Sequence, residues 1–140
     1  MQIQRIQTLM LLIAAILVGI FCFCPFATLP ATETAEAASV YTHDAPVLLT
    51  LNILIAVLLV IVIFMYKNLR MQMRMTVLSM LLICASIVTS AFIMFAGLEG
   101  ATPILFGGVL LLVLALVFAI LAYRGMSHDN KLLRSMDRLR

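Results

Sequence analysis

Hydrophobic residues fill four long stretches of the chain, at about residues 8–26, 47–66, 76–96 and 103–123. A helix needs about 20 apolar residues to cross the hydrocarbon core of a bilayer. The strands of a membrane β-barrel would alternate in polarity, and these stretches do not alternate. The pattern predicts a single all-α membrane domain, residues 1–140, with four transmembrane helices in an up-down-up-down bundle.

The segment after the fourth stretch, residues 124–140, is the only long polar part of the sequence. Leu132, Met136 and Leu139 recur there at helical spacing, and the basic residues fall mainly away from this apolar stripe. A basic amphipathic helix of this kind lies in the plane of the membrane interface. We therefore expect a short C-terminal amphipathic helix on the cytoplasmic side. Anchoring of the bundle and docking of a partner are both open as its role.

Lys and Arg occur only in the two terminal segments and in the connection between the second and third stretches. The nine basic residues lie before the first stretch, between the second and third, or after the fourth: Arg5, Lys67, Arg70, Arg74, Arg124, Lys131, Arg134, Arg138 and Arg140. The other two connections contain no Lys or Arg. Because cytoplasmic loops are enriched in these residues, both termini and the middle loop are expected in the cytoplasm. This placement favours membrane topology over a nucleic-acid surface, and we expect no nucleic-acid partner.

The first apolar stretch has a second interpretation as a secretory signal peptide cleaved at Ala35-Glu36-Ala37. That stretch is longer than the usual apolar region of a signal peptide and ends well before the cleavage site, so a retained span is favoured. The connection over residues 27–46 is expected to be a solvated loop with no domain of its own. Pro46 is expected to start the second helix. His43-Asp44 is too small a set to indicate a metal site.

Polar residues within the spans are few. Asn52 lies inside the outer end of the second span, and Ser86 and Ser90 share one face of the third. Such residues join helices in membranes, although substrate contact is an alternative for Asn52. No Asp, Glu, Lys, Arg or His lies in any of the four spans. Ion-coupled transport usually places such residues within the membrane, so a coupled transporter is disfavoured.

The sequence contains little that predicts catalysis. Cys22 and Cys24 form C-x-C, and side chains two apart on a helix point in nearly opposite directions, which disfavours a local disulfide. Cys84 lies within the third span, and all three cysteines are interpreted as structural. Phosphate-loop, zinc-helix and nucleophile-elbow motifs are absent from the sequence. We expect no enzyme activity, no cofactor and no metal. A redox enzyme is a third hypothesis, and it requires Cys22 or Cys24 to react with a thiol probe in a redox-dependent way.

Four polar pieces carry a resemblance to a known family. They are Ile3–Thr8 (IQRIQT), two pieces of the middle loop (Tyr66-Lys67-Asn68 and Gln72-Met73-Arg74), and Leu133–Arg140 (LRSMDRLR). The chain resembles, over its whole length, the small four-span membrane proteins found mainly in the Bacteroides group and catalogued as a domain of unknown function. In that family an Asp-Glu pair precedes the tail lysine, where this chain has Asp129-Asn130-Lys131. The resemblance implies four spans in an inner membrane, and it implies no activity or catalytic residue.

These observations predict a non-enzymatic integral protein of the bacterial inner membrane with an interaction or assembly role. Its expected cytoplasmic face comprises Arg5, Lys67, Arg70, Arg74, Arg134, Asp137 and Arg138. We hypothesise that Arg5 pairs with Asp137. The expected partners are anionic lipid headgroups and a membrane or cytoplasmic protein. The alternative is a small carrier or channel-like protein that acts as a homo-oligomer, with Asn52 and the polar side of the third span lining its pathway.

Overall fold

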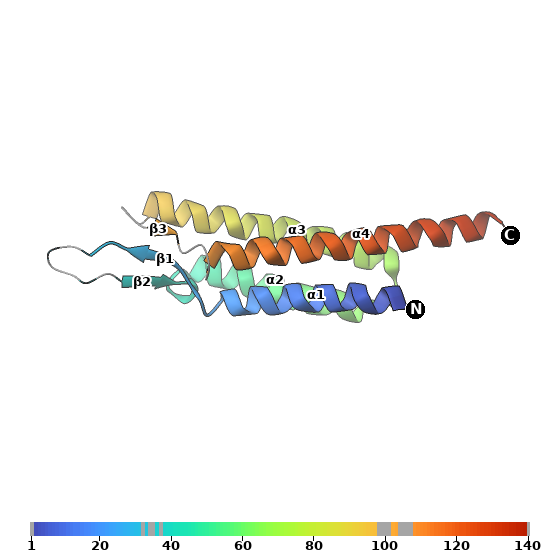
Figure 1. The fold of residues 1–140 in the computed structure, drawn as a ribbon, viewed down its shortest axis with the longest axis horizontal. Coiled ribbons are helices and arrows are strands. Elements are labelled where there is room, and N and C mark those ends of the chain that lie inside the picture. Colours follow the sequence, from blue (N-terminus) through green and yellow to red (C-terminus); the bar gives the residue numbers. More distant parts are fainter. Residues whose placement is uncertain are drawn as a thin grey trace.

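The computed structural model describes residues 2–31, 33, 36, 38–97, 102–103 and 108–139. This part of the chain contains four α-helices, which lie side by side in an elongated bundle (Figure 1): α1 Gln2–Phe21, α2 Pro46–Phe64, α3 Leu69–Phe92 and α4 Leu110–Arg138. Helices that follow one another run in opposite directions (Figure 1). Both α1 and α3 pack against α2 and α4. The start of α1 and the end of α4 lie at one end of the bundle, here called the terminal end.

The outer surface of the bundle is apolar. Leu54, Leu81 and Val88 are each more than half exposed, as are many other large hydrophobic side chains. All four helices are long and apolar enough to cross a membrane. Soluble monomers rarely expose continuous apolar surface of this extent. The prediction of four membrane-crossing helices is therefore confirmed by helix length and composition.

The interior follows one spacing in every helix. Buried residues recur at alternating steps of four and three: Gln7, Leu11, Ala14, Val18 and Phe21 in α1; Leu48, Asn52, Ile55, Leu59 and Val62 in α2; Gln72, Thr76, Ser79, Ile83, Ser86 and Ser90 in α3; Leu112, Ala115, Ala119, Ala122 and Met126 in α4. This is the core spacing of four-helix bundles with coiled-coil-like packing. The core stripe of α3 is polar apart from Ile83. In this helix, therefore, mainly polar side chains face the core and apolar side chains face the outer surface.

A small antiparallel sheet lies at the opposite end, here called the sheet end. β1 (Pro25–Leu29) pairs with β2 (Ala38–Tyr41) and with β3 (Thr102–Pro103), in the order β2-β1-β3 (Figure 1). The expectation of a solvated loop over residues 27–46 is therefore wrong for the parts that form β1 and β2. Phe26 and Ala27 of β1 are fully buried. Their burial stabilises the strands, which the polar composition of the connection over residues 27–46 does not predict.

Helix boundaries differ from the expected spans. α1 ends at Phe21 instead of residue 26, because Pro25 lacks a backbone N–H and begins β1. Pro103 lies in β3, and α4 begins at Leu110. α3 begins at Leu69, so most of the expected middle loop is helical; its Leu, Arg, Met and Gln residues are good helix formers. Pro46 is the first residue of α2, as predicted.

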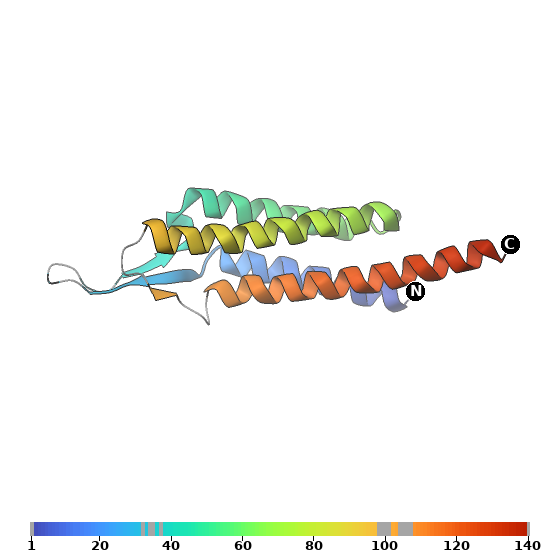
Figure 2. The same cartoon turned by 90° about the horizontal axis from the view of Figure 1, so that it is seen from above.

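The C-terminal segment is a continuation of α4. This helix runs without interruption from Leu110 to Arg138, and its last turns extend past the other three helices (Figures 1 and 2). The expectation of a separate short helix in the membrane plane is therefore corrected. No proline interrupts the segment. Gly125, Asp129 and Asn130 are weak helix formers, but α4 continues through them. We call residues 131–139 the tail.

Candidate functional site

A buried polar contact marks the place where the tail leaves the bundle. The Nε2 of Gln7 on α1 donates a 2.7 Å hydrogen bond to Oδ2 of Asp129 on α4. Gln7 is only 4% exposed. Gly125, one turn before Asp129, gives this side chain room: a Cβ at Gly125 would lie 3.0 Å from Cγ of Gln7. Polar groups removed from water need such partners, so this contact fixes α1 against α4.

A second contact fixes the start of α3. The side chain of Gln72, also 4% exposed, donates from Nε2 to the backbone oxygen of Val62 on α2 at 3.2 Å. Gln7, Asp129 and Gln72 were not predicted from the sequence as contacts between helices. Helical spacing could have indicated that Gln7 and Gln72 are buried. Gln7 lies four residues before Leu11 and Gln72 lies four before Thr76, and all four residues are on the buried stripe of their helix.

Most of the expected interaction face forms one groove at the terminal end, between the start of α3 and the end of α4. Its volume is about 530 Å³, and its charged lining residues are Lys67, Arg70, Arg74, Arg134 and Asp137. We call these five residues, with Asn130 between them, the basic groove. Sequence reasoning predicted the charged residues as one face but not the groove.

Arg5 and Arg138 lie outside the basic groove. Arg5 lines a separate groove with Tyr66 and residues of α1. Within the described part of the chain, no ion pair joins Arg5 to Asp137, and the hypothesised pairing is not formed. The acidic residue that contacts α1 is instead Asp129, through Gln7.

The tail itself presents a mixed apolar and basic surface. Every residue from Lys131 to Leu139 is exposed. Met136 is 67% exposed and Leu139 is 89% exposed. A groove of about 430 Å³ follows the base of the tail, with Leu132, Leu133 and Met136 on one wall and residues of α1 and α3 opposite. These apolar side chains have few neighbours within the bundle.

The intramembrane polar residues contact one another. The hydroxyl of Ser86 donates to Oδ1 of Asn52 at 3.0 Å, and Nδ2 of Asn52 donates to the oxygen of Leu48 at 2.7 Å. Both side chains are fully buried. Ser90, the third residue expected there, donates to Ile87 of its own helix at 2.8 Å. Among the described residues, no buried side-chain nitrogen or oxygen lacks a hydrogen-bond partner, so this cluster has the geometry of a helix-joining contact.

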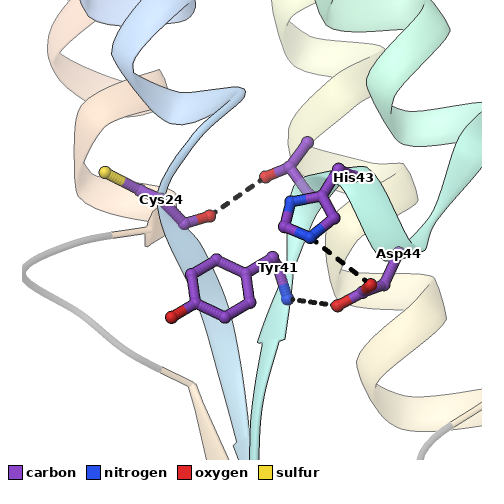
Figure 3. A network of polar contacts seen from close by, with 5 residues as sticks. Cys24, Tyr41, His43 and Asp44 are labelled. Atoms are coloured by element: carbon purple, nitrogen blue, oxygen red, sulfur yellow. Dashed lines mark hydrogen bonds and ion pairs between the residues drawn. The ribbon is translucent and has the colours of Figure 1, made fainter.

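A network of polar contacts lies at the sheet end, between the strands and the start of α2 (Figure 3). Thr42 donates from its hydroxyl to the backbone oxygens of Phe21 at 2.8 Å and Cys24 at 3.3 Å. The backbone N–H of Tyr41 donates to Oδ2 of Asp44 at 3.0 Å, and His43 lies 3.6 Å from the Asp44 carboxylate. No cluster of three or more His, Cys, Asp or Glu occurs among the described residues. The network joins the first hairpin to the start of α2.

The three cysteines are free and lie in different surroundings. Cys22 is buried just past the end of α1, and its burial raises the pKa of its thiol. Cys24 is half-buried, and Cys84 is exposed on the membrane-facing surface of α3. A reactive cysteine needs a stabilised thiolate, and burial of Cys22 works against one.

Four long apolar helices, an inward-facing polar stripe and an apolar outer surface define a multi-pass α-helical membrane protein. Within that class, the chain belongs to the family described as Domain of unknown function (DUF4293), whose model matches residues 3–139. This confirms the resemblance to a family of unknown function. Comparison with curated proteins gives no match, and neither does comparison with solved structures. The geometry therefore carries the functional argument.

Proposed function

We propose that this protein is a non-enzymatic component of a bacterial inner membrane that docks a partner protein through its tail. The observation that carries the proposal is the exposure of the whole tail, Lys131 to Leu139, beyond the other three helices. An exposed helix with apolar and basic side chains suits recognition by the apolar groove of a partner. The basic residues around the apolar ones favour a partner with an acidic rim.

Charge distribution supports a cytoplasmic position for the terminal end. The basic residues lie at this end, while Glu33, Glu36 and Asp44 lie at or beside the sheet end. Positive charge marks the cytoplasmic side of membrane proteins. Reporter tags at both termini and within residues 31–38 test this orientation. Protease accessibility of a terminal tag from the periplasmic side would contradict it.

Site-specific crosslinking tests docking. A photoreactive residue at Met136 is expected to yield a discrete protein adduct in native membranes, and one at the membrane-facing Val117 is the matched control. Replacing Arg134, Asp137 and Arg138 by Ala is expected to weaken recovery of that adduct. Unchanged recovery, with the variant still inserted in the membrane, would contradict a docking role for the tail.

The alternative of a carrier or channel gains no support from Asn52. Its amide oxygen accepts from Ser86 and its nitrogen donates to Leu48, so both polar atoms are occupied within the protein. A pathway residue needs polar atoms that face its solute. Flux through liposomes that contain the wild type, compared with Asn52→Leu, tests the alternative: loss of a measurable flux in this variant would restore it.

A further inference from the structure

The basic groove continues toward the membrane as a smaller cavity of about 220 Å³. Arg70, Arg74, Asn130 and Arg134 line both parts of the groove. The smaller cavity adds three apolar or aromatic side chains, Met73, Val77 and Tyr123. Met73 lies beside Arg74 on α3, and Val77 and Tyr123 lie further along their helices toward the sheet end. The groove therefore has a charged mouth and an apolar continuation.

The positive charge in the mouth is not balanced within the protein. Four cations and the single carboxylate of Asp137 line it, which leaves a formal charge of +3. In the described part of the chain, none of these residues forms an ion pair. Guanidinium groups repel one another at close range, and each offers a fork of N–H donors that matches the oxygens of a phosphate. A bound phosphate anion would both offset the repulsion and satisfy these donors.

Helix length places this mouth at the membrane surface. α2 has 19 residues, or about 28 Å at 1.5 Å per residue, close to the thickness of ~30 Å for a hydrocarbon core. The hydrogen bond from Gln72 to Val62 sets the first turns of α3 level with the last turn of α2. Arg70 and Arg74 flank Gln72 and so lie at headgroup depth. Val77 lies three residues beyond Arg74 on α3, or about 4.5 Å deeper at 1.5 Å per residue, among the acyl chains.

We propose that the basic groove binds the headgroup of an anionic phospholipid such as phosphatidylglycerol. The phosphate would lie against Arg70, Arg74 and Arg134, and one acyl chain would lie along Met73, Val77 and Tyr123. The apolar continuation favours a lipid over an acidic peptide, because Val77 adjoins the exposed membrane-facing Leu78 and Leu81, where peptide backbone would lose its hydrogen bonds to water. The proposal uses the membrane-surface position of this end, but it does not require a docked protein.

Binding of a phosphatidylglycerol with a fluorescent acyl chain to the full chain, in nanodiscs of phosphatidylcholine, tests the site. The test variant replaces Arg70, Arg74 and Arg134 by Gln, and the matched control replaces Arg5, Arg124 and Arg138, which removes the same charge. We expect affinity to fall about tenfold or more in the test variant and by less than about threefold in the control. All six side chains are exposed, and circular dichroism checks that helix content is kept.

Equal weakening in the two variants would overturn the proposal, because it would show general attraction to net charge. Competitors identify the ligand. Dihexanoyl phosphatidylglycerol is expected to displace the probe, and inorganic phosphate or glycerophosphoglycerol at the same concentration is not. Displacement by these soluble anions, or by an oligoglutamate peptide, would also overturn it. Replacing Leu132, Met136 and Leu139 by Ser tests tail docking separately and is expected to leave lipid affinity unchanged.

Discussion

Gln7 and Asp129 are 122 positions apart in sequence, yet a 2.7 Å hydrogen bond joins the side chain of one to the carboxylate of the other. The bond links the first helix to the last at the terminal end. On the sheet-end side of this bond α4 packs against α1 and α3, and beyond it every residue of the tail is exposed.

Replacing Gln7 by Ala is expected to destabilise the bundle by about 1–3 kcal/mol, because it leaves a half-buried carboxylate without its donor. Thermal unfolding in detergent, followed by circular dichroism, measures the effect. Gln4→Ala is the control, since that side chain is exposed one turn earlier. Equal melting temperatures for the two variants would show that the contact contributes nothing to stability.

Alanine substitutions at three glycines should differ in a fixed order. Gly19 has open space around it, so Gly19→Ala is expected to be neutral or to stabilise α1 by up to about 1 kcal/mol. A Cβ at Gly125 would press on the flexible side chain of Gln7, and one at Gly108 would lie 2.8 Å from the backbone Cα of Phe26. Gly108→Ala is therefore expected to be the most damaging, at about 1–3 kcal/mol. A lower melting temperature for Gly19→Ala than for Gly108→Ala would refute this order.

Asn52 and Ser86 should be energetically coupled. A double-mutant cycle with Asn52→Leu and Ser86→Ala is expected to give a coupling of about 0.6–2 kcal/mol in unfolding free energy. The same cycle with Ser90→Ala is the control and should be additive, because Ser90 donates to its own helix. Coupling with Ser90 as large as that with Ser86 would argue against a specific contact.

Thiol labelling should separate Cys22 from Cys24. The thiolate is the reactive form, and burial raises the pKa of Cys22, so its thiolate forms only at higher pH. In single-cysteine variants, maleimide should therefore react more slowly at Cys22 than at Cys24. Faster labelling of Cys22 near neutral pH would revive the redox hypothesis.

The helical class was predictable because a membrane-crossing helix needs little beyond a sufficient length of apolar sequence. The contacts between helices were less predictable. Hydropathy does not report how a helix is rotated about its axis, and this rotation decides that Asp129, not Asp137, is the acidic residue that contacts α1. The same limit applies to the tail, since a separate helix and an extension of α4 share the same stripe of Leu132, Met136 and Leu139.

The sheet was missed for a different reason. β1 pairs with β2 and also with Thr102–Pro103, which lies far along the chain. Pairing between distant segments is difficult to predict from local sequence, because strand formation depends on the neighbouring strands. Asn52, Ser86 and Ser90 could be singled out from the sequence, because polar side chains within apolar spans are rare. The contact between Asn52 and Ser86 required the positions of α2 and α3.

The unbroken course of α4 has a mechanical consequence. Its 29 residues make a rod about 44 Å long at 1.5 Å per residue, and bending such a rod requires backbone hydrogen bonds to stretch or break. A push or twist applied to the tail is therefore delivered to the far end of α4, where Gly108 lies against Phe26 of the sheet. One continuous helix thus connects the tail with the sheet end of the bundle.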